Sequence, residues 1–260
     1  MIDYLNSIRT ESERFGRLIA ELPASTPVPS CPEWSVADLT WHLAEVQYFW
    51  ASIVAGLLDS PRSVVDLERP GDEALPRLFE QQSGFLLKAL ASRQPGDVCW
   101  SWHNSGHSVG WVLRRQAHEA LIHRVDAELA QGGAFAVDPD LAADGVDEVL
   151  TVMLNAADLP DWATFHPAGT TVEVRLAHNP VSWAMELGTF TGTSPATGNN
   201  YDDPALRLLP ALEEPTAVIT AAATDLDLWL WGRGSDDAIE IIGPDDIGDR
   251  VRAIAAAGTQ

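Results

Sequence analysis

Three side chains of this sequence have the chemical type and spacing of a metal site: His42, Glu119 and His123. Glu119 and His123 are four residues apart in a stretch of helical periodicity, so their side chains lie within about 40° of one another on one helix face. His42 occupies an inward position of another predicted helix, where apolar spacing would favour a leucine. Two imidazoles and one carboxylate that leave coordination positions open are typical of a catalytic zinc site. The sequence therefore predicts that the three side chains meet at one divalent ion.

Each of these residues also has a simpler interpretation when it is taken alone. His42 could be a core histidine bonded to a neighbouring carbonyl, and Glu119 with His123 could be a surface pair worth a few tenths of a kcal/mol. His118 points about 100° away from Glu119, so we exclude it as a ligand and expect a packing or supporting role. Asp126 could orient an imidazole from behind, or it could be a solvated helix charge.

Other reactive side chains lie in or near a loop rich in tryptophan, residues 99–111. This loop could wall a substrate cleft, and His103 or His107 could add ligands, but buried tryptophans with surface histidines would explain it equally. Cys31 and Cys99 form no CxxC pair, so neither a zinc knuckle nor a disulfide scaffold is indicated. Either thiol could be a nucleophile, although the sequence places no base beside it.

The composition limits the classes of partner. The chain has 260 residues, 46% of them hydrophobic, and 38 acidic against 16 basic residues give a formal charge of −22. Such a charge disfavours binding to nucleic acid or to anionic membranes. The N-terminal residues lack the layout of a signal peptide, and no apolar run approaches the roughly 20 residues of a membrane span. We expect a reduced cytoplasmic protein, either a monomer or a homodimer.

The elements that must position the three residues lie in a helical first half. Ser35 is predicted to cap the second helix with Asp38 completing a capping box, and Gly132 follows the end of the fourth. Helical patterns cover about 1–21, 36–58, 72–93, 108–131 and 139–157. His42 therefore lies on the second predicted helix, and Glu119 and His123 lie on the fourth.

The second half of the chain has a mixed pattern. Alternating apolar and β-branched residues predict two strands joined as a hairpin, followed by two further strands and two helices. The strands are predicted at 171–177, 181–187, 216–223 and 238–242, and the helices at 224–232 and after Pro244. The expected architecture is a helical bundle over residues 1–158 and a smaller α+β domain over residues 159–260.

Two segments resemble the N-terminal domain of the mycothiol-dependent maleylpyruvate isomerases, a group of DinB-like metal-binding four-helix bundles. They are CPEWSVADLTWHLAEV (31–46) and RRQAHEALIHRVDAE (114–128). The family pattern is C-P-x-W-[ST]-V-x-D-L-x-x-H-L followed by E-x-x-x-H-R-x-D. The resemblance implies that the zinc ligands of the family fall on His42, Glu119 and His123, which are also the residues that the spacing selects.

The C-terminal half resembles the sterol-carrier-like domain of the same family. DLDLWLWGR (225–233) is similar to a helix of that domain that ends in Gly-Arg. The resemblance implies that Arg233 is a functional residue, catalytic and cosubstrate-binding. From the sequence alone, Arg233 could equally be a charge that complements the dipole at the end of the helix.

The resemblance implies an enzyme that uses zinc to activate a low-molecular-weight thiol, mycothiol, for addition to a small electrophile. In the isomerase, addition to the cis double bond of maleylpyruvate, rotation and loss of the thiolate would give the trans product. An S-transferase would keep the new C–S bond. Two alternatives remain open: a non-catalytic protein that binds a metal or small ligand, and a metal-dependent hydrolase with water in the open position. The same ligands also suit Fe²⁺, Ni²⁺ or Mn²⁺.

Overall fold

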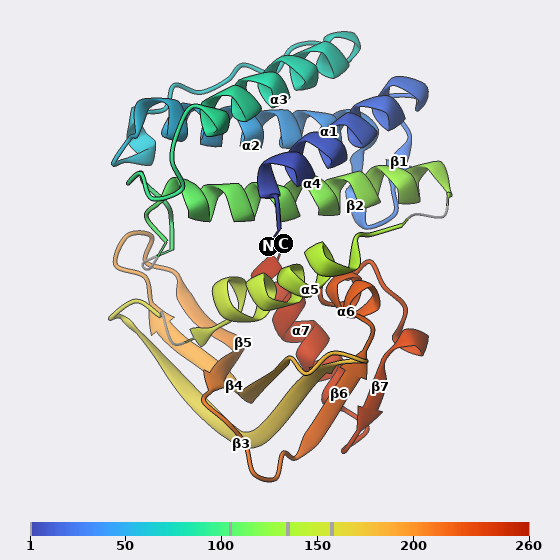
Figure 1. The fold of residues 1–260 in the computed structure, drawn as a ribbon. Coiled ribbons are helices and arrows are strands. Elements are labelled where there is room, and N and C mark those ends of the chain that lie inside the picture. Colours follow the sequence, from blue (N-terminus) through green and yellow to red (C-terminus); the bar gives the residue numbers. More distant parts are fainter. Residues whose placement is uncertain (1, 104–105, 134–135, 157–158, 260) are drawn as a thin grey trace. The chain divides into compact units, whose positions relative to one another are not determined.

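The computed structural model describes residues 2–103, 106–133, 136–156 and 159–259. The chain divides into two compact units, Met1–Ala136 and Val137–Gln260 (Figure 1). The first unit is helical and the second contains a five-stranded sheet, so the predicted combination of a helical part and an α+β part is confirmed. None of the helices within the described ranges combines the length and hydropathy that a membrane-spanning segment needs.

The first unit is formed by long helices that pack against one another. Helix α4 packs on α1 and α2, and α3 packs on the same two helices. A small antiparallel hairpin of β1 and β2 connects α1 to α2. The bounds are α1 (Tyr4–Glu21), β1 (Pro27–Val28), β2 (Cys31–Ser35), α2 (Val36–Gly56), α3 (Leu75–Ala91) and α4 (Val109–Gln131). Phe15, Leu39, Leu43 and Phe79 are buried together in one core.

The start of α2 is fixed by the predicted capping box. The Ser35 hydroxyl accepts a hydrogen bond from the Asp38 amide, and the Asp38 carboxylate accepts one from the Ser35 amide at 2.9 Å. Arg69 adds an ion pair to the same carboxylate at 2.8 Å. Hydrogen bonds from the Ser35 side chain and backbone, together with Arg69, lower the pKa of Asp38 to about 2. The cap residue Ser35 lies about two turns before His42 and sets where the helix begins.

Replacing Asp38 with asparagine should remove part of the acid sensitivity of the fold. Because the folded-state pKa of Asp38 is about 2, below its ordinary value of 3.8, its ionised form stabilises the fold fully above pH of about 4. That contribution is lost as the pH falls through 2. The difference in unfolding free energy between the original chain and Asp38→Asn should therefore shrink from pH 5 to pH 2 in urea titrations. A constant difference would contradict the prediction.

The second unit is a sheet with helices gathered on one of its faces (Figure 1). The strand order is β5-β4-β3-β6-β7, in which β3 and β6 pair in parallel and the other neighbours are antiparallel. The strands are β3 (Ala163–Leu176), β4 (Ser182–Thr193), β5 (Asn200–Leu209), β6 (Ala217–Ala221) and β7 (Glu240–Ile242). The helices are α5 (Pro139–Glu148), α6 (Ala223–Leu230) and α7 (Ile247–Thr259), and a π-helical turn, η3 (Val149–Met153), follows α5.

Helix α5 belongs to the second unit. The boundary was expected after residue 158, which is itself outside the described residues, whereas the structure divides between Ala136 and Val137. The physical reason is packing: α5 contacts α6, and the Trp183 indole of β4 donates to Asp147 at 2.9 Å. A helical pattern alone cannot show whether a helix packs with the elements before it or with those after it.

Candidate metal centre

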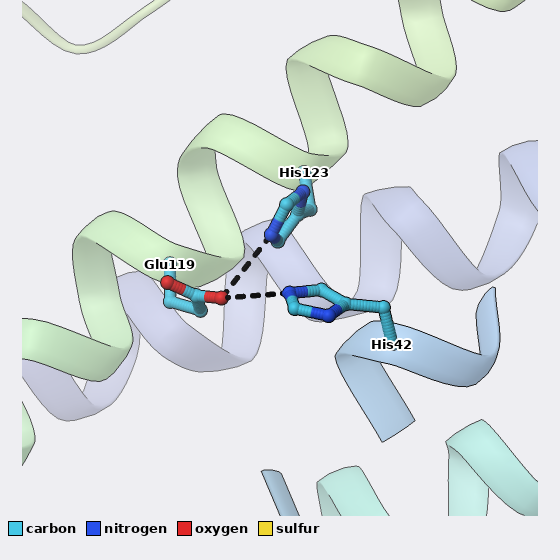
Figure 2. A group of neighbouring side chains, drawn as sticks. All are labelled: His42, Glu119 and His123. Atoms are coloured by element: carbon cyan, nitrogen blue, oxygen red, sulfur yellow. Dashed lines mark hydrogen bonds and ion pairs between the residues drawn. The ribbon is translucent and has the colours of Figure 1, made fainter. Parts of the chain in front are cut away.

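The three residues predicted to bind a metal converge within the first unit (Figure 2). His42 comes from α2, while Glu119 and His123 come from successive turns of α4. Glu119 Oε1 lies 3.1 Å from His123 Nε2 and 3.4 Å from His42 Nε2. One ligand atom from each residue lies within 4.8 Å of the others. Side chains from two helices that are distant in the sequence thus direct one oxygen and two nitrogens toward a common point.

The two separations from Glu119 are close to those expected between the ligands of a tetrahedral zinc ion. Two ligand atoms that each lie about 2.0–2.2 Å from a tetrahedral ion are about 3.3–3.6 Å apart. The separations of 3.1 and 3.4 Å from Glu119 Oε1 to the two imidazole nitrogens are close to that edge length. Three protein ligands would leave a fourth position for a small molecule, which is the arrangement of catalytic rather than structural zinc.

Neighbouring polar groups orient Glu119 and His123. Arg115, itself buried, donates to Glu119 Oε2 at 3.2 Å, which leaves Oε1 directed toward the two histidines. His123 Nδ1 donates to Asp126 at 2.9 Å, so Nε2 is the nitrogen that faces Glu119. The fully buried Asp126 also accepts a hydrogen bond from the Ser30 hydroxyl in the β1–β2 turn. The sequence allowed two interpretations of Asp126, a residue that orients an imidazole and a solvated helix charge. Its burial shows that the second interpretation is wrong.

The charges within this group shift its titration. Burial would raise the pKa of Glu119, but hydrogen bonds from His123 and His42 and the positive charges of His123 and Arg115 hold it well below its usual range. Burial would lower the pKa of His123, but hydrogen bonds to Asp126 and Glu119 raise it to about 9. Without a metal, His123 therefore carries a proton at neutral pH, and an arriving metal ion must displace that proton.

Trp34 forms an aromatic wall beside the histidines. Its ring lies 4.8 Å from the His42 ring and 6.3 Å from the His123 ring, measured between centroids. Trp34 belongs to β2, so the short hairpin contributes both this indole and, through the Ser30 turn, a support for Asp126. Neither contact could be read from the sequence of the segment between the first two predicted helices.

Asp126→Asn should weaken metal binding without unfolding the protein. The amide keeps the size of the carboxylate but not its charge, so His123 loses the partner that fixes which nitrogen faces the metal. Loss of such a partner costs about 10- to 100-fold in metal affinity. Competition with a chromophoric chelator measures the dissociation constant for zinc. Asp144→Asn in the second unit is the control, and equal affinity in both variants would contradict the prediction.

Two family models match nearly all of the chain. Residues 5–128 match the mycothiol maleylpyruvate isomerase N-terminal domain, and residues 140–250 match the C-terminal domain of the same family. The chain belongs to the mycothiol maleylpyruvate isomerase family. The predicted resemblance is thereby confirmed over both halves, and the two matched ranges lie one in each of the compact units.

Solved structures related to this family share the fold. A crystal structure of the mycothiol-dependent maleylpyruvate isomerase is similar with a TM-score of 0.57 and 14% sequence identity, covering 92% of this chain and 91% of that one. A histidine-to-alanine mutant of that isomerase gives the same TM-score and coverage at 12% identity. A comparison with curated protein sequences finds no match.

Arg233, the family-implied residue of the C-terminal half, lies just after α6 in the second unit. Its guanidinium donates to the Trp231 carbonyl and lies over the Trp231 ring, 6.0 Å from the centroid. The backbone amide of Arg233 donates to the Leu228 carbonyl at 2.7 Å, which closes the end of the helix. The residue therefore contributes to the helix end, as one of the two sequence interpretations expects, while its side chain remains partly exposed.

The other histidines considered as ligands are outside the group of three. His118 is buried and its ring meets Tyr4 edge-on, with 6.5 Å between centroids. His103 is buried in the loop, whereas His107 is exposed and accepts a hydrogen bond from the Ser101 amide. Residues 104 and 105 of that loop lie outside the described residues. Among the described residues, the cluster suited to a metal contains none of these three.

Cys99 does not have the environment of an activated thiol. Burial, with a contribution from the charge of Asp97, raises the pKa of Cys99, so its thiol stays protonated at neutral pH. Cys31 is half-buried and packs at the edge of the helical core.

Proposed function

We propose that this protein binds zinc through His42, Glu119 and His123 and uses it to activate mycothiol for addition to a small electrophile. The observation that carries the proposal is the convergence of these three side chains, with ligand atoms within 4.8 Å, in a chain of this family. A divalent ion at this position lowers the pKa of a thiol so that it reacts as the thiolate. The proposal covers two reactions. One is the isomerisation of a maleylpyruvate-like substrate, and the other is the transfer of the thiol to an electrophile to form a stable thioether.

The surrounding residues have defined tasks in this proposal. Arg115 holds one oxygen of Glu119, and Asp126 holds the far nitrogen of His123, so both ligands are oriented before the metal arrives. Trp34 covers one side of the two imidazoles and limits the access of water. A cytoplasmic location fits because both cysteines are free.

Thiol-dependent turnover tests the proposal. Zinc-loaded protein is assayed with maleylpyruvate in the presence and absence of mycothiol, with elemental analysis of the same sample. Loss of the cis isomer only when mycothiol and metal are both present supports the isomerase, and a thioether product supports the S-transferase. Metal binding without any thiol-dependent reaction would instead favour a non-catalytic metal protein, and thiol-independent hydrolysis would favour a hydrolase.

We further propose that Arg233 acts in catalysis and binds either a carboxylate of the substrate or the thiol cosubstrate. Its partly exposed guanidinium is a suitable donor for an anionic group. Arg233→Lys, which keeps the charge but not the paired donors, should raise KM or lower kcat of the thiol-dependent reaction by about tenfold. The thermal midpoint of unfolding should change little. A fall in stability without a kinetic effect would leave only the helix-end role.

A further inference from the structure

Gln116 of α4 is a buried amide that none of the roles described so far uses. Only 1% of the residue is exposed. Within the described part of the chain, neither its side-chain oxygen nor its side-chain nitrogen has a hydrogen-bond partner. Burying an unpaired polar group is costly, and most buried polar groups in folded proteins are paired. Both atoms of this amide are therefore available to a ligand.

Helix geometry places Gln116 on the same face of α4 as two of the candidate metal ligands. It precedes Glu119 by three residues and His123 by seven. At about 100° per residue, its side chain lies within about 60° of the first and about 20° of the second. Residues three apart on a helix have Cβ atoms about 5–6 Å apart. The amide thus leaves α4 one turn from the carboxylate of the cluster.

Two ring contacts show that this face of α4 is turned toward α2. The His123 ring meets the His42 ring with 4.8 Å between centroids, and nearer the start of α4 the Trp111 ring meets the Trp50 ring at 5.5 Å. The two helices are therefore antiparallel along this stretch. Gln116 lies between the two contacts in α4, next to the cluster and inside the first unit.

The neighbouring donors are already engaged by carboxylates. Arg115 donates to Glu119 Oε2, and His123 Nδ1 donates to Asp126. The Gln116 amide has two N–H donors without a partner among the described residues. Because the amide is neutral, it can donate near the cluster without repelling a divalent cation, as a lysine or arginine in its place would.

The proposed isomerisation develops a charge that needs such a donor. The thiolate sulfur forms a bond to one carbon of a C=C bond that is conjugated to a carbonyl group. The π electron pair moves toward the carbonyl, whose oxygen becomes negative, and the former double bond can rotate. Return of the electron pair expels the thiolate and restores the double bond, so no proton, oxidant or reductant is consumed. N–H donors at that oxygen stabilise the charged state more than the neutral substrate.

We propose that Gln116 is a catalytic residue whose amide donates a hydrogen bond to the carbonyl oxygen of the electrophile as that oxygen becomes charged. The inference rests on the proposed thiol chemistry and assigns the donor that it requires. Only 10% of the His123 side chain and 17% of the Glu119 side chain are exposed, so a molecule that reaches them contacts interior groups. No hydrogen bond has to break before the Gln116 amide turns toward such a molecule.

Kinetics of two matched variants test the role of the amide. Gln116→Met keeps the length of the side chain and removes both donors. With zinc-loaded protein, mycothiol and maleylpyruvate, kcat should fall by about 100-fold or more, while KM rises by no more than about fivefold. Gln47→Met is the control, because Gln47 is a fully buried glutamine that lies about 140° from His42 on α2 and donates to Ser12 at 3.0 Å. Its kcat should stay within about twofold, and both variants should retain zinc.

Two further measurements do not depend on turnover. Succinylpyruvate keeps the carbonyl groups but has no double bond to accept a thiolate, and calorimetry measures its binding to the zinc-loaded protein. Gln116→Met should weaken that binding about threefold or more, and Gln47→Met should not. In metal-free protein, Gln116→Met should raise the thermal midpoint by about 2–4 °C, because an unpaired amide is no longer buried. Gln47→Met should lower the midpoint, since it loses the bond to Ser12.

The outcomes separate this inference from the proposed function. Unchanged kcat and unchanged affinity for succinylpyruvate in Gln116→Met would overturn the catalytic role and leave the thiol chemistry in place. An equal loss of kcat in Gln47→Met would also overturn it, because any change to a buried amide would then impair the enzyme. A lower thermal midpoint for Gln116→Met would show that the amide is paired within the protein. Absence of thiol-dependent turnover in the unsubstituted chain would contradict the proposed function, and the role of Gln116 with it.

Discussion

His42→Ala is expected to abolish zinc binding while the helical unit remains folded. His42 supplies the α2 nitrogen of the cluster, and its removal leaves Glu119 and His123 alone on α4. Loss of a ligand must cost more than the roughly 10- to 100-fold that follows loss of a residue that only orients one. The His42 side chain is 33% exposed, so its truncation should change stability by only about 1 kcal/mol or less.

Elemental analysis after dialysis against zinc measures this outcome. The unsubstituted chain should retain about one equivalent, and the His42→Ala variant should retain close to none. His107→Ala is the matched control, since His107 is an exposed histidine outside the cluster. Stoichiometric zinc in the His42→Ala protein, or equal loss in the His107→Ala protein, would show that the metal lies elsewhere.

Arg124→Ala should destabilise the protein by about 3–5 kcal/mol, because it removes the cation between two buried carboxylates. Arg124 is fully buried, and its guanidinium bonds to Glu11 of α1, to Glu128 of α4 at 2.7 Å and to the Ala136 carbonyl at 3.1 Å. The family-type motif that contains His123 thus also contains the residue that ties α1 to α4. The free energy of unfolding of a typical protein is about 5–15 kcal/mol, so such a loss is a large fraction of it.

Urea unfolding at neutral pH measures the effect, and two further variants identify its cause. Arg124→Met fills most of the volume but removes the cation that Glu11 and Glu128 share, so it should be nearly as destabilising as Arg124→Ala. Arg14→Ala removes the outer ion pair to Glu128, in which Arg14 is 31% exposed, and should cost only about 1 kcal/mol or less. A cost for Arg124→Ala no larger than that for Arg14→Ala would contradict the prediction.

Much of the helical unit and the composition of the site could be predicted from the sequence. The repeat of apolar residues every three to four positions places the four helices of the first unit, and the signals at Ser35, Asp38 and Gly132 place helix ends where the structure has them. The i,i+4 spacing of Glu119 and His123 requires that they share a face once α4 forms. These features are local, since they depend on backbone geometry within a few residues.

The sheet was predicted only where its pattern was local. The β3–β4 hairpin and the short β6 and β7 strands were expected, although β3 and β4 are longer than predicted. Strand β5, Asn200–Leu209, was missed because its start carries asparagine, two aspartates and a proline, which disfavour a strand. It forms because it pairs with β4 along its whole length. The parallel pairing of β3 with β6 joins segments about 45 residues apart and has no sequence signal.

Tertiary structure alone decided what surrounds the three candidate ligands. Ser30 reaches Asp126, 96 residues away, and Arg69 reaches Asp38 from a loop, because helix packing brings these segments together. Tertiary structure also decides to which unit α5 belongs. Its helical pattern is local, but its contacts with α6 and Trp183 place it in the second unit. Periodicity determines which face of a helix is buried, whereas the partner that covers that face depends on the arrangement of the whole chain.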